Sequence, residues 1–249
     1  MDEIEFSESG TPILRYEAIE PHVPDGGDLP DIEAISAHIE RHIGPIEMVW
    51  HEILSDLVHI DVMHVAPNKE RPFHTLITCG MSARPMNVPL EIADQFGDID
   101  PRFAELMICL PADWPLSQKA FGNPCHFWPV EWLKRLARFP HEYQTWFFEG
   151  HTMPNGDPAR PFSPDTQLCC MMLVPPLRVP AEFRVLRGED RAINFFAMMP
   201  LYQSEIDFKL KNGGEALLDL CDEHNVDELL DIHRAAVVPT APKRRWFGR

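Results

Sequence analysis

One stretch of the chain, residues 126–162, constrains the fold most, because it specifies three kinds of local structure within forty residues. A helix is expected first, beginning at Pro129 and ending at Pro140. Residues 143–148 (YQTWFF) then predict an aromatic strand, and residues 151–162 (HTMPNGDPARPF) predict a loop dense in turn formers. The apolar stripe of the helix, at helical spacing, is Trp132, Leu133, Leu136 and Ala137.

The 25 prolines, roughly twice average usage, favour many short elements with irregular connections, and so an α+β fold over a helical bundle. Asp31 is expected to cap a helix ending near Ile43, with Ile32, Ile35 and Ile39 on its apolar face. The apolar run 104–110 predicts a central strand covered on both faces. Other strands are expected at 46–54, 58–65, 73–79, 168–174, 183–186 and 193–199, and other helices from Ser204 to Asn212-Gly213 and over 214–224.

The chain divides into three expected parts. Residues 1–30 form an acidic, turn-rich lead-in, residues 31–235 form one domain, and residues 236–249 form a basic tail. No internal repeat and no linker long enough to separate two cores interrupts the middle part. At 249 residues the chain is long enough to bury a sizeable core.

The charge balance limits the classes of partner. The chain has 22 basic and 39 acidic side chains, for a formal net charge of −17. Residues 1–70 alone contain 16 acidic and 3 basic side chains, a balance of −13. Such a field repels phosphate, so nucleic-acid and anionic-membrane binding are not expected. A basic protein or peptide would be favoured as a partner.

The six cysteines occur without a CxxC pair, so neither a zinc ribbon nor a thioredoxin motif is present. Free thiols in a reducing compartment are expected. The first residues, MDEIEFSESG, do not resemble a secretion signal, and no apolar run approaches the length of a membrane span. A cytoplasmic location is therefore predicted.

Two groups of residues could suggest catalysis. His59, Asp61 and His64 resemble a metal motif, but on a strand residues 59 and 61 share one face and residue 64 points to the other. A polar, solvent-facing strand surface is the simpler interpretation. No phosphate-binding loop, dinucleotide fingerprint or HExxH motif occurs, so no metal and no cofactor are predicted.

The second group centres on Cys125-His126, a thiol that could have a base nearby. No cysteine-protease signature surrounds it, and Gly80-Met81-Ser82 lacks the second glycine of a nucleophile elbow. A thiol or metal hydrolase remains the enzymatic alternative. The other candidates for its acid–base groups are His141, His151, Asp157 and Asp165.

The loop 151–157 is more readily explained by shape than by catalysis. Asn155-Gly156-Asp157-Pro158 is typical of a turn, and His151 is expected to anchor the loop through hydrogen bonds. The preceding aromatic side chains cannot all face inward from one strand, so some are expected in an exposed groove.

Five runs of the sequence resemble the suppressor of fused domain family, especially its compact bacterial members. They are spread in order through residues 31–232, which is far more specific than one short motif. They are HEILSDLVHIDVMHVAP (51–67), RPFHTLITCGMS (71–82), AELMICLPADWP (104–115), WLKRLARFPHEYQTWFFEGHTMPNGDP (132–158) and INFFAMMPLYQSEIDFKLKNGGEALL (193–218).

The resemblance implies a single α+β domain with a mixed, largely antiparallel sheet flanked by helices. Animal members of the family are not known as enzymes; they hold a short extended peptide as an added strand. A non-catalytic protein-binding domain is therefore the main hypothesis, and an immunity protein that neutralises a toxin is the alternative, as proposed for bacterial members. The predicted partner-binding residues are Tyr143, Trp146, Phe148, His151, Asn155 and Asp157.

Overall fold

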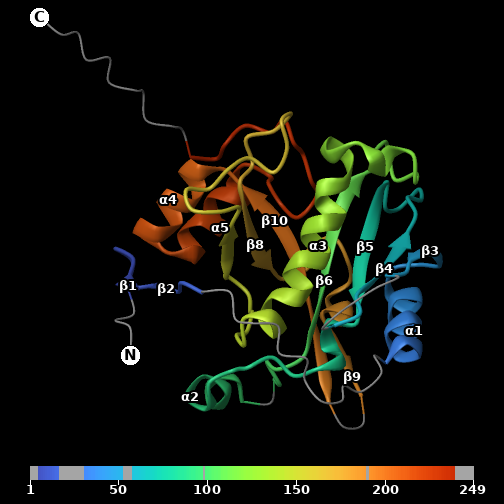
Figure 1. Ribbon diagram of the computed structural model, residues 1–249, viewed down its shortest axis with the longest axis horizontal. Coiled ribbons are helices and arrows are strands. Elements are labelled where there is room, and N and C mark those ends of the chain that lie inside the picture. Colours follow the sequence, from blue (N-terminus) through green and yellow to red (C-terminus); the bar gives the residue numbers. More distant parts are fainter. Residues whose placement is uncertain (1–4, 17–30, 53–57, 98, 189–190, 239–249) are drawn as a thin grey trace, which may run out of the picture.

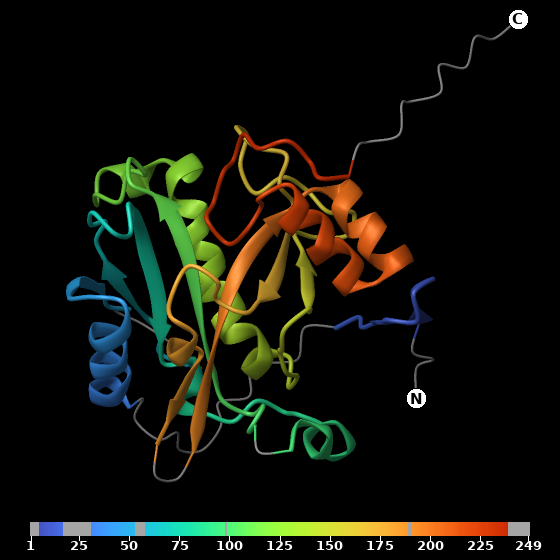
Figure 2. The ribbon, with the colours of Figure 1, turned by 180° about the vertical axis from the view of Figure 1, so that it is seen from behind.

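In the part of the chain that the structure describes, an eight-stranded sheet lies at the centre and helices cover both its faces (Figures 1 and 2). The structure is a computed structural model, and it describes residues 5–16, 31–52, 58–97, 99–188 and 191–238. The strands are β3 (Ile46–Trp50), β4 (Asp61–Val65), β5 (Phe73–Cys79), β6 (Ala104–Pro111), β7 (Thr152–Pro154), β8 (Cys170–Val174), β9 (Val185–Arg187) and β10 (Ala192–Leu201). The helices are α1 (Ile32–His42), α2 (Leu90–Ala93), α3 (Pro124–Glu142), α4 (Gln203–Asn212) and α5 (Gly214–Glu223).

The sheet has the order β3-β4-β5-β6-β10-β8-β7, and β9 pairs with the first part of β10. Among these described strands the pair β6–β10 is parallel, from Ala104 opposite Asn194 to Met107 opposite Ala197. The other pairs are antiparallel. The predicted α+β class with a mixed, largely antiparallel sheet is therefore confirmed.

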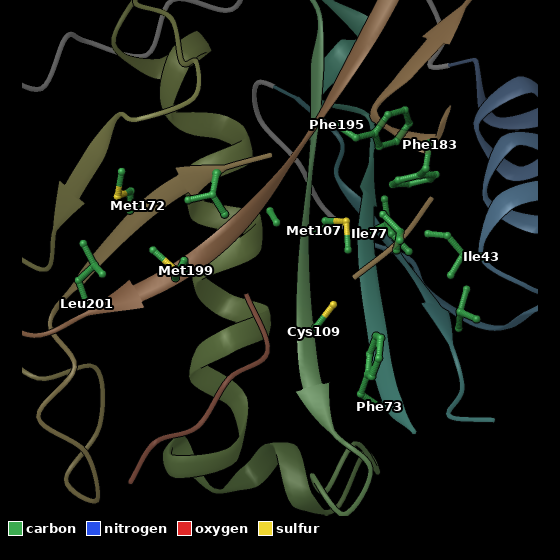
Figure 3. Packing of buried hydrophobic residues seen from close by; sticks show 14 of the residues in the cluster. Ile43, Phe73, Ile77, Met107, Cys109, Met172, Phe183, Phe195, Met199 and Leu201 are labelled. Atoms are coloured by element: carbon green, nitrogen blue, oxygen red, sulfur yellow. The ribbon is translucent and has the colours of Figure 1, made fainter. Parts of the chain in front are cut away.

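Strand β6 is central and buried on both faces, as its apolar run predicts. Its side chains alternate: Leu106 and Ile108 belong to one core cluster, and Met107 and Cys109 to the other. Figure 3 shows Met107 and Cys109 on the same face as Ile77 of β5.

Each face of the sheet has its own helices. Helix α3 covers one face and buries Trp128, Trp132, Leu133 and Leu136 there. Helices α1, α4 and α5 cover the opposite face, where Ile39, Ile206 and Leu217 are buried. Both layers bury apolar surface against one sheet, which is the main source of stability in a fold of this kind.

Helix α1 begins where its sequence predicts. The Asp31 carboxylate accepts a hydrogen bond from the backbone N–H of Ala34 at 3.2 Å, which satisfies one free donor of the first turn. Ile35 and Ile39 are fully buried. Ile32, expected on the same face, is instead 45% exposed, because the first turn extends beyond the edge of the core.

Helix α3 is longer than its prolines predict, and the expected limits at Pro129 and Pro140 are wrong. The helix begins at Pro124, after Asn123, whose side chain accepts a hydrogen bond from the Cys125 N–H. Pro129 and Pro140 both lie inside it. Each proline removes one backbone hydrogen bond. Burial of the tryptophan-rich face offsets that loss.

Several strands and one helix end differ from their predicted bounds. Strand β3 ends at Trp50, and the last two residues of its predicted range, 53 and 54, lie outside the described residues. Strands β4 and β8 begin later than predicted, at Asp61 and Cys170. Helix α4 begins at Gln203, before the predicted cap Ser204, whose hydroxyl donates to the Val238 carbonyl instead. The predicted hairpin of β9 and β10 is present.

Residues 226–238, here called the C-terminal segment, return to the sheet after α5. Strands β6 and β10 stop pairing after Met107, and Leu229 forms a parallel bridge with Cys109 beyond that point. The Leu230 N–H donates to the Cys109 carbonyl at 2.9 Å. The segment thus pairs with the part of the β6 edge that β10 leaves unpaired. Of the predicted basic tail, residues 239–249 lie outside the described residues, as do residues 1–4 and 17–30 of the predicted lead-in.

Candidate functional site

The aromatic run 143–148 is an irregular segment after α3, so the predicted strand is wrong. The Tyr143 N–H donates to the Phe139 carbonyl at 3.0 Å, and Gln144 has a φ of 49°, which reverses the chain. Thr145 then accepts a backbone hydrogen bond from the Asn87 N–H at 2.9 Å. Strand propensity cannot act here, because the segment lies against a loop and not beside another strand.

The side chains of this segment alternate between core and surface. Phe147 is buried beneath α3, whereas Trp146 and Phe148 are only partly buried. Phe96, on the short helix Asp94–Phe96, contacts both, with ring centroids 6.2 Å from Trp146 and 4.3 Å from Phe148. Phe96, Trp146 and Phe148 are here called the aromatic patch.

His151 follows the patch and anchors its loop. Its ring lies edge-on to Trp146, with centroids 4.7 Å apart, and its backbone carbonyl accepts a hydrogen bond from the Leu173 N–H. Burial, together with the nearby positive charge of Lys209, lowers the pKa of His151 to about 4. The side chain is therefore neutral at pH 7, and its ring packs against Trp146.

Strand β7 is an edge of the sheet, because among the described strands it pairs with β8 alone. Leu173 N–H bonds to the His151 carbonyl, and Asn155 N–H bonds to the Cys169 carbonyl. In an antiparallel pair these bonds alternate along the strand, so the backbone groups of Thr152 point away from β8. The Thr152 hydroxyl accepts from Lys209 of α4 at 3.3 Å.

In the loop after β7, Asn155 fixes the shape of the backbone and Asp157 is exposed to solvent. The Asn155 side-chain amide donates to the carbonyls of Arg160 and Pro161, at 2.9 and 3.1 Å, which fixes the turn. Asp157 is 84% exposed and accepts a hydrogen bond from Arg15 at 3.0 Å. The loop is thus pre-shaped and presents a carboxylate.

Tyr143 lies at the far end of the site, stacked on Phe139 with centroids 4.3 Å apart. Tyr16 from the N-terminal lead-in packs edge-on against both rings and bonds to the Thr145 hydroxyl. Phe139, Thr145 and Tyr16 were not predicted from the sequence. No local pattern could have paired Tyr16 with Thr145, because they are 129 positions apart.

The residues of the suspected metal motif, His59, Asp61 and His64, form hydrogen bonds with one another and with histidines that the sequence analysis did not single out. His59 and the unpredicted His51 both bond to the Asp61 carboxylate at 2.8 Å. His64 bonds to His74, also at 2.8 Å. The expected solvent-facing surface is wrong at Asp61 and His64, which are buried. No group of three or more histidine, cysteine or acidic side chains within the described residues is arranged to hold a metal.

Of the residues suspected of forming a thiol-hydrolase site around Cys125, only some lie near one another. Cys125, His126 and Asp165 line a cavity of about 880 Å³ between the start of α3 and the C-terminal segment. Within the described residues no hydrogen bond joins the thiol to either other side chain. His141 lies at the opposite end of α3 and donates a hydrogen bond to the Met81 carbonyl. At a helix rise of about 1.5 Å per residue, it is about 24 Å from Cys125 along the helix.

The family model described as Suppressor of fused protein (SUFU) matches residues 56–235, more than half of the chain. The chain belongs to the suppressor of fused protein family. Comparison with curated proteins finds no match.

Solved structures of suppressor of fused proteins share the fold. A SUFU homolog from Neisseria gonorrhoeae FA 1090 has a TM-score of 0.58 and 22% identity, covering 84% of this chain and 97% of that one. A chain of the Sufu-Fu complex has a TM-score of 0.56 and 13% identity, covering 84% and 93%. Drosophila Suppressor of Fused has a TM-score of 0.53 and 12% identity, covering 84% of this chain and 50% of that one.

In this suppressor of fused family member, the six predicted site residues lie along one continuous path from the end of α3, past the aromatic patch, to the loop after β7. Asp157 and Tyr143 both lie near the N-terminal lead-in, at Arg15 and Tyr16. None of the six lines the 880 Å³ cavity. Among the described residues, no helix combines the length and apolar character needed to cross a bilayer.

Proposed function

We propose that this domain is a non-catalytic binding protein that holds an extended segment of a protein partner along strand β7. The observation that carries the proposal is the free edge of β7 beside the aromatic patch. Edge strands present unpaired backbone groups that readily pair with another chain. Thr152 would supply its outward N–H and C=O to the added strand.

The aromatic patch supports this proposal, because it gives the added strand a place for an anchoring side chain. Trp146 and Phe148 are partly exposed, and their rings are supported by His151 and by the buried Phe196, respectively. A rigid aromatic surface loses little conformational entropy on binding. Interface residues that dominate affinity are often tryptophan, tyrosine or arginine.

The charge of the chain supports a basic partner. A net charge of −17 would speed the encounter with a cationic protein and repel nucleic acid. One structural neighbour is a chain of the Sufu-Fu complex, which supports a protein partner in that relative. Neutralisation of a basic toxin is the second candidate function, and the excess of acidic side chains is the observation that favours it.

The test selects binders from a library of random short peptides and then compares variants of the domain. Thr152→Pro removes the outward N–H but no bond to β8, so it should weaken a selected peptide about ten-fold. Trp146→Ala should weaken the same peptide by about 2 kcal/mol. Isothermal titration measures both affinities.

Two matched variants serve as controls. Thr152→Val keeps the N–H and should bind like the parent protein. Phe147→Ala removes a buried ring and should lower the free energy of unfolding by about 3 kcal/mol or more. If Thr152→Pro and Trp146→Ala remain folded and bind the peptides as tightly as the parent, strand β7 is not the binding edge.

A further inference from the structure

The N-terminal residues 5–16, here called the strap, contact Tyr143 and Asp157, the two ends of the predicted site. The strap is a small hairpin of β1 (Glu5–Phe6) and β2 (Pro12–Ile13), closed by a hydrogen bond from the Ser7 N–H to the Thr11 carbonyl. Figures 1 and 2 show it beside α4, separate from the central sheet.

One backbone hydrogen bond anchors the strap to α4. The Ser9 N–H donates to the Leu210 carbonyl at 3.0 Å, and the Ser9 hydroxyl donates to the Lys209 carbonyl at 3.4 Å. Both carbonyls lie in the last turn of α4, and the Lys209 carbonyl also accepts from the Gly213 N–H at 2.8 Å. The strap is therefore attached at the C-terminal end of α4.

Tyr16 joins the strap to the residues at the end of α3. Its hydroxyl lies 2.6 Å from the Thr145 hydroxyl. Its ring meets Phe139 and Tyr143 edge-on, with centroids 5.4 and 6.1 Å away. Tyr16 is 36% exposed, less than Leu14 at 48% and Phe6 at 62%. The strap thus places the Tyr16 side chain against one hydroxyl group and two aromatic rings.

Arg15, the residue before Tyr16, pairs with the loop after β7. Its guanidinium donates to Asp157 at 3.0 Å and to Glu5 of the strap at 3.1 Å. These groups are more than half exposed, so the pair is weak and sensitive to salt. Phe139, Tyr143, Thr145 and Asp157 are here called the Arg–Tyr subsite, because they receive these two adjacent side chains.

The attachment of the strap is slight compared with the packing of the core. Within the described residues, the polar and aromatic contacts between the strap and the rest of the domain are the Ser9 hydrogen bonds, the Tyr16 contacts and an exposed ion pair. Elements with few buried contacts open at a low free-energy cost. A segment on the same chain also has a high effective concentration, so even weak contacts keep it in place when no competitor is present.

We propose that the strap is an intramolecular ligand that fills the Arg–Tyr subsite, and that a partner displaces it with its own arginine followed by an aromatic residue. The inference rests on the proposed function, because the subsite adjoins the β7 edge, and it adds the chemistry of the partner and its regulation. A partner that competes with the strap can bind only to molecules in which the strap has left the subsite. Its apparent affinity is therefore the intrinsic affinity multiplied by the fraction of such molecules.

The experiment uses a fluorescein-labelled peptide of residues 5–16 (EFSESGTPILRY) and the full-length protein. Fluorescence anisotropy measures its affinity for the parent and for the double variant Arg15→Ala/Tyr16→Ala, which vacates the subsite. The double variant should bind the peptide about ten-fold more tightly than the parent, because the intramolecular competitor is gone. Leu14→Ala, an exposed change in the same strap, should behave like the parent.

Two further titrations identify the contacts. A peptide with Tyr16→Ala should bind the double variant at least about ten-fold more weakly. Adding Asp157→Asn to the double variant should weaken the unaltered peptide and reduce the dependence of its affinity on salt. Circular dichroism confirms that each variant is folded.

Equal binding by the parent and the double variant would overturn the proposal, as would no binding to the double variant at millimolar peptide. These failures differ from a failure of the proposed function. If selected peptides depend on Thr152 but the strap peptide does not bind, strand addition stands and the strap is only structural. If the strap peptide binds and Thr152→Pro has no effect, the subsite stands and the β7 edge does not.

Discussion

Glu105 is a single buried carboxylate that organises the turn after β5. It is fully buried and accepts four hydrogen bonds: from the Thr78 hydroxyl at 2.6 Å, from the N–H groups of Gly80 and Ser82 at 2.9 Å, and from the Ser82 hydroxyl at 2.6 Å. Gly80 has a φ of 134°, and a Cβ there would lie 2.0 Å from the His59 carbonyl oxygen. The Gly80-Met81-Ser82 sequence is thus a carboxylate-held turn.

Glu105→Gln should lower the free energy of unfolding by about 3 kcal/mol, because the amide NH₂ would face donors and weaken hydrogen bonds to a charged acceptor. Urea denaturation measures the change. Glu70→Gln, on an exposed loop, should leave the stability within about 0.5 kcal/mol of the parent. A Glu105→Gln protein as stable as the Glu70→Gln control would contradict this role.

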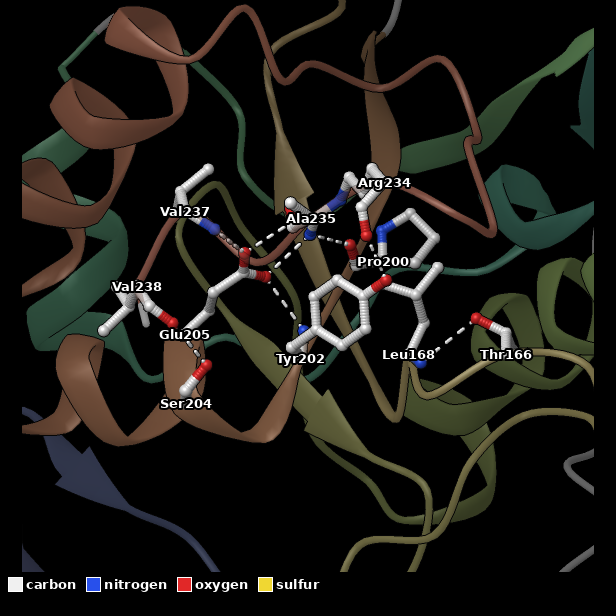
Figure 4. Close-up of polar contacts among 10 residues, drawn as sticks. All are labelled: Thr166, Leu168, Pro200, Tyr202, Ser204, Glu205, Arg234, Ala235, Val237 and Val238. Carbon is white, nitrogen blue, oxygen red and sulfur yellow. Dashed lines mark hydrogen bonds and ion pairs between the residues drawn. The ribbon is translucent and has the colours of Figure 1, made fainter. Parts of the chain in front are cut away.

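At the scale of elements, the C-terminal segment is held by one buried ion pair (Figure 4). Both oxygens of Glu205, which is fully buried in α4, accept from the Arg234 guanidinium at 2.6 Å. The same carboxylate accepts from the N–H groups of Tyr202 and Val237, each at 2.9 Å. The guanidinium also lies 4.8 Å from the centre of the Tyr202 ring. These contacts join α4 and Tyr202, the residue before it, to the C-terminal segment.

Arg234→Met should destabilise the protein by about 3–5 kcal/mol, because it leaves the Glu205 carboxylate buried without its countercharge. The double variant Glu205→Gln/Arg234→Met removes both charges and should recover part of the loss. Unfolding free energies of the parent, both single variants and the double variant give the coupling of the two residues. Additive losses would show that the pair does not act as a unit.

Elements with strong local signals were predictable, and elements that depend on distant partners were not. Helix α1 formed as expected, because its Asp31 cap and apolar spacing lie within one short stretch. Residues 143–148 have high strand propensity but no strand beside them. Helix α3 continued through two prolines because tertiary burial of its tryptophans outweighed the local rule.

For the whole molecule, five buried or partly buried histidines should make stability decrease in acid. Burial lowers the pKa of each relative to an ordinary histidine, so protonation favours the unfolded state. Stability from these groups is complete above their unfolded pKa, near 6.5, and falls as pH decreases toward the folded pKa. Glu149 and Glu228 act in the opposite direction, because burial raises their pKa. The histidines are His38, His64, His74, His141 and His151.

His151 alone, with a folded pKa of about 4, should account for a loss of about 2 kcal/mol between pH 7.5 and pH 5. Urea denaturation across this range measures the slope. His151→Phe removes the titrating group and should reduce the decrease by that amount, while the slope between pH 7.5 and pH 8.5 should not change. An unchanged slope below pH 6.5 in His151→Phe would contradict this assignment.

The sequence by itself determined the fold class, the double burial of β6, the cap of α1 and the family, because each depends on residues close together or on runs compared in order. Tertiary structure alone decided that β7 is an edge, and that the strap places Tyr16 on Thr145. Which strand pairs with which, and which distant side chains meet, is settled by packing of the whole core. A sequence pattern specifies the faces of an element but not its neighbours.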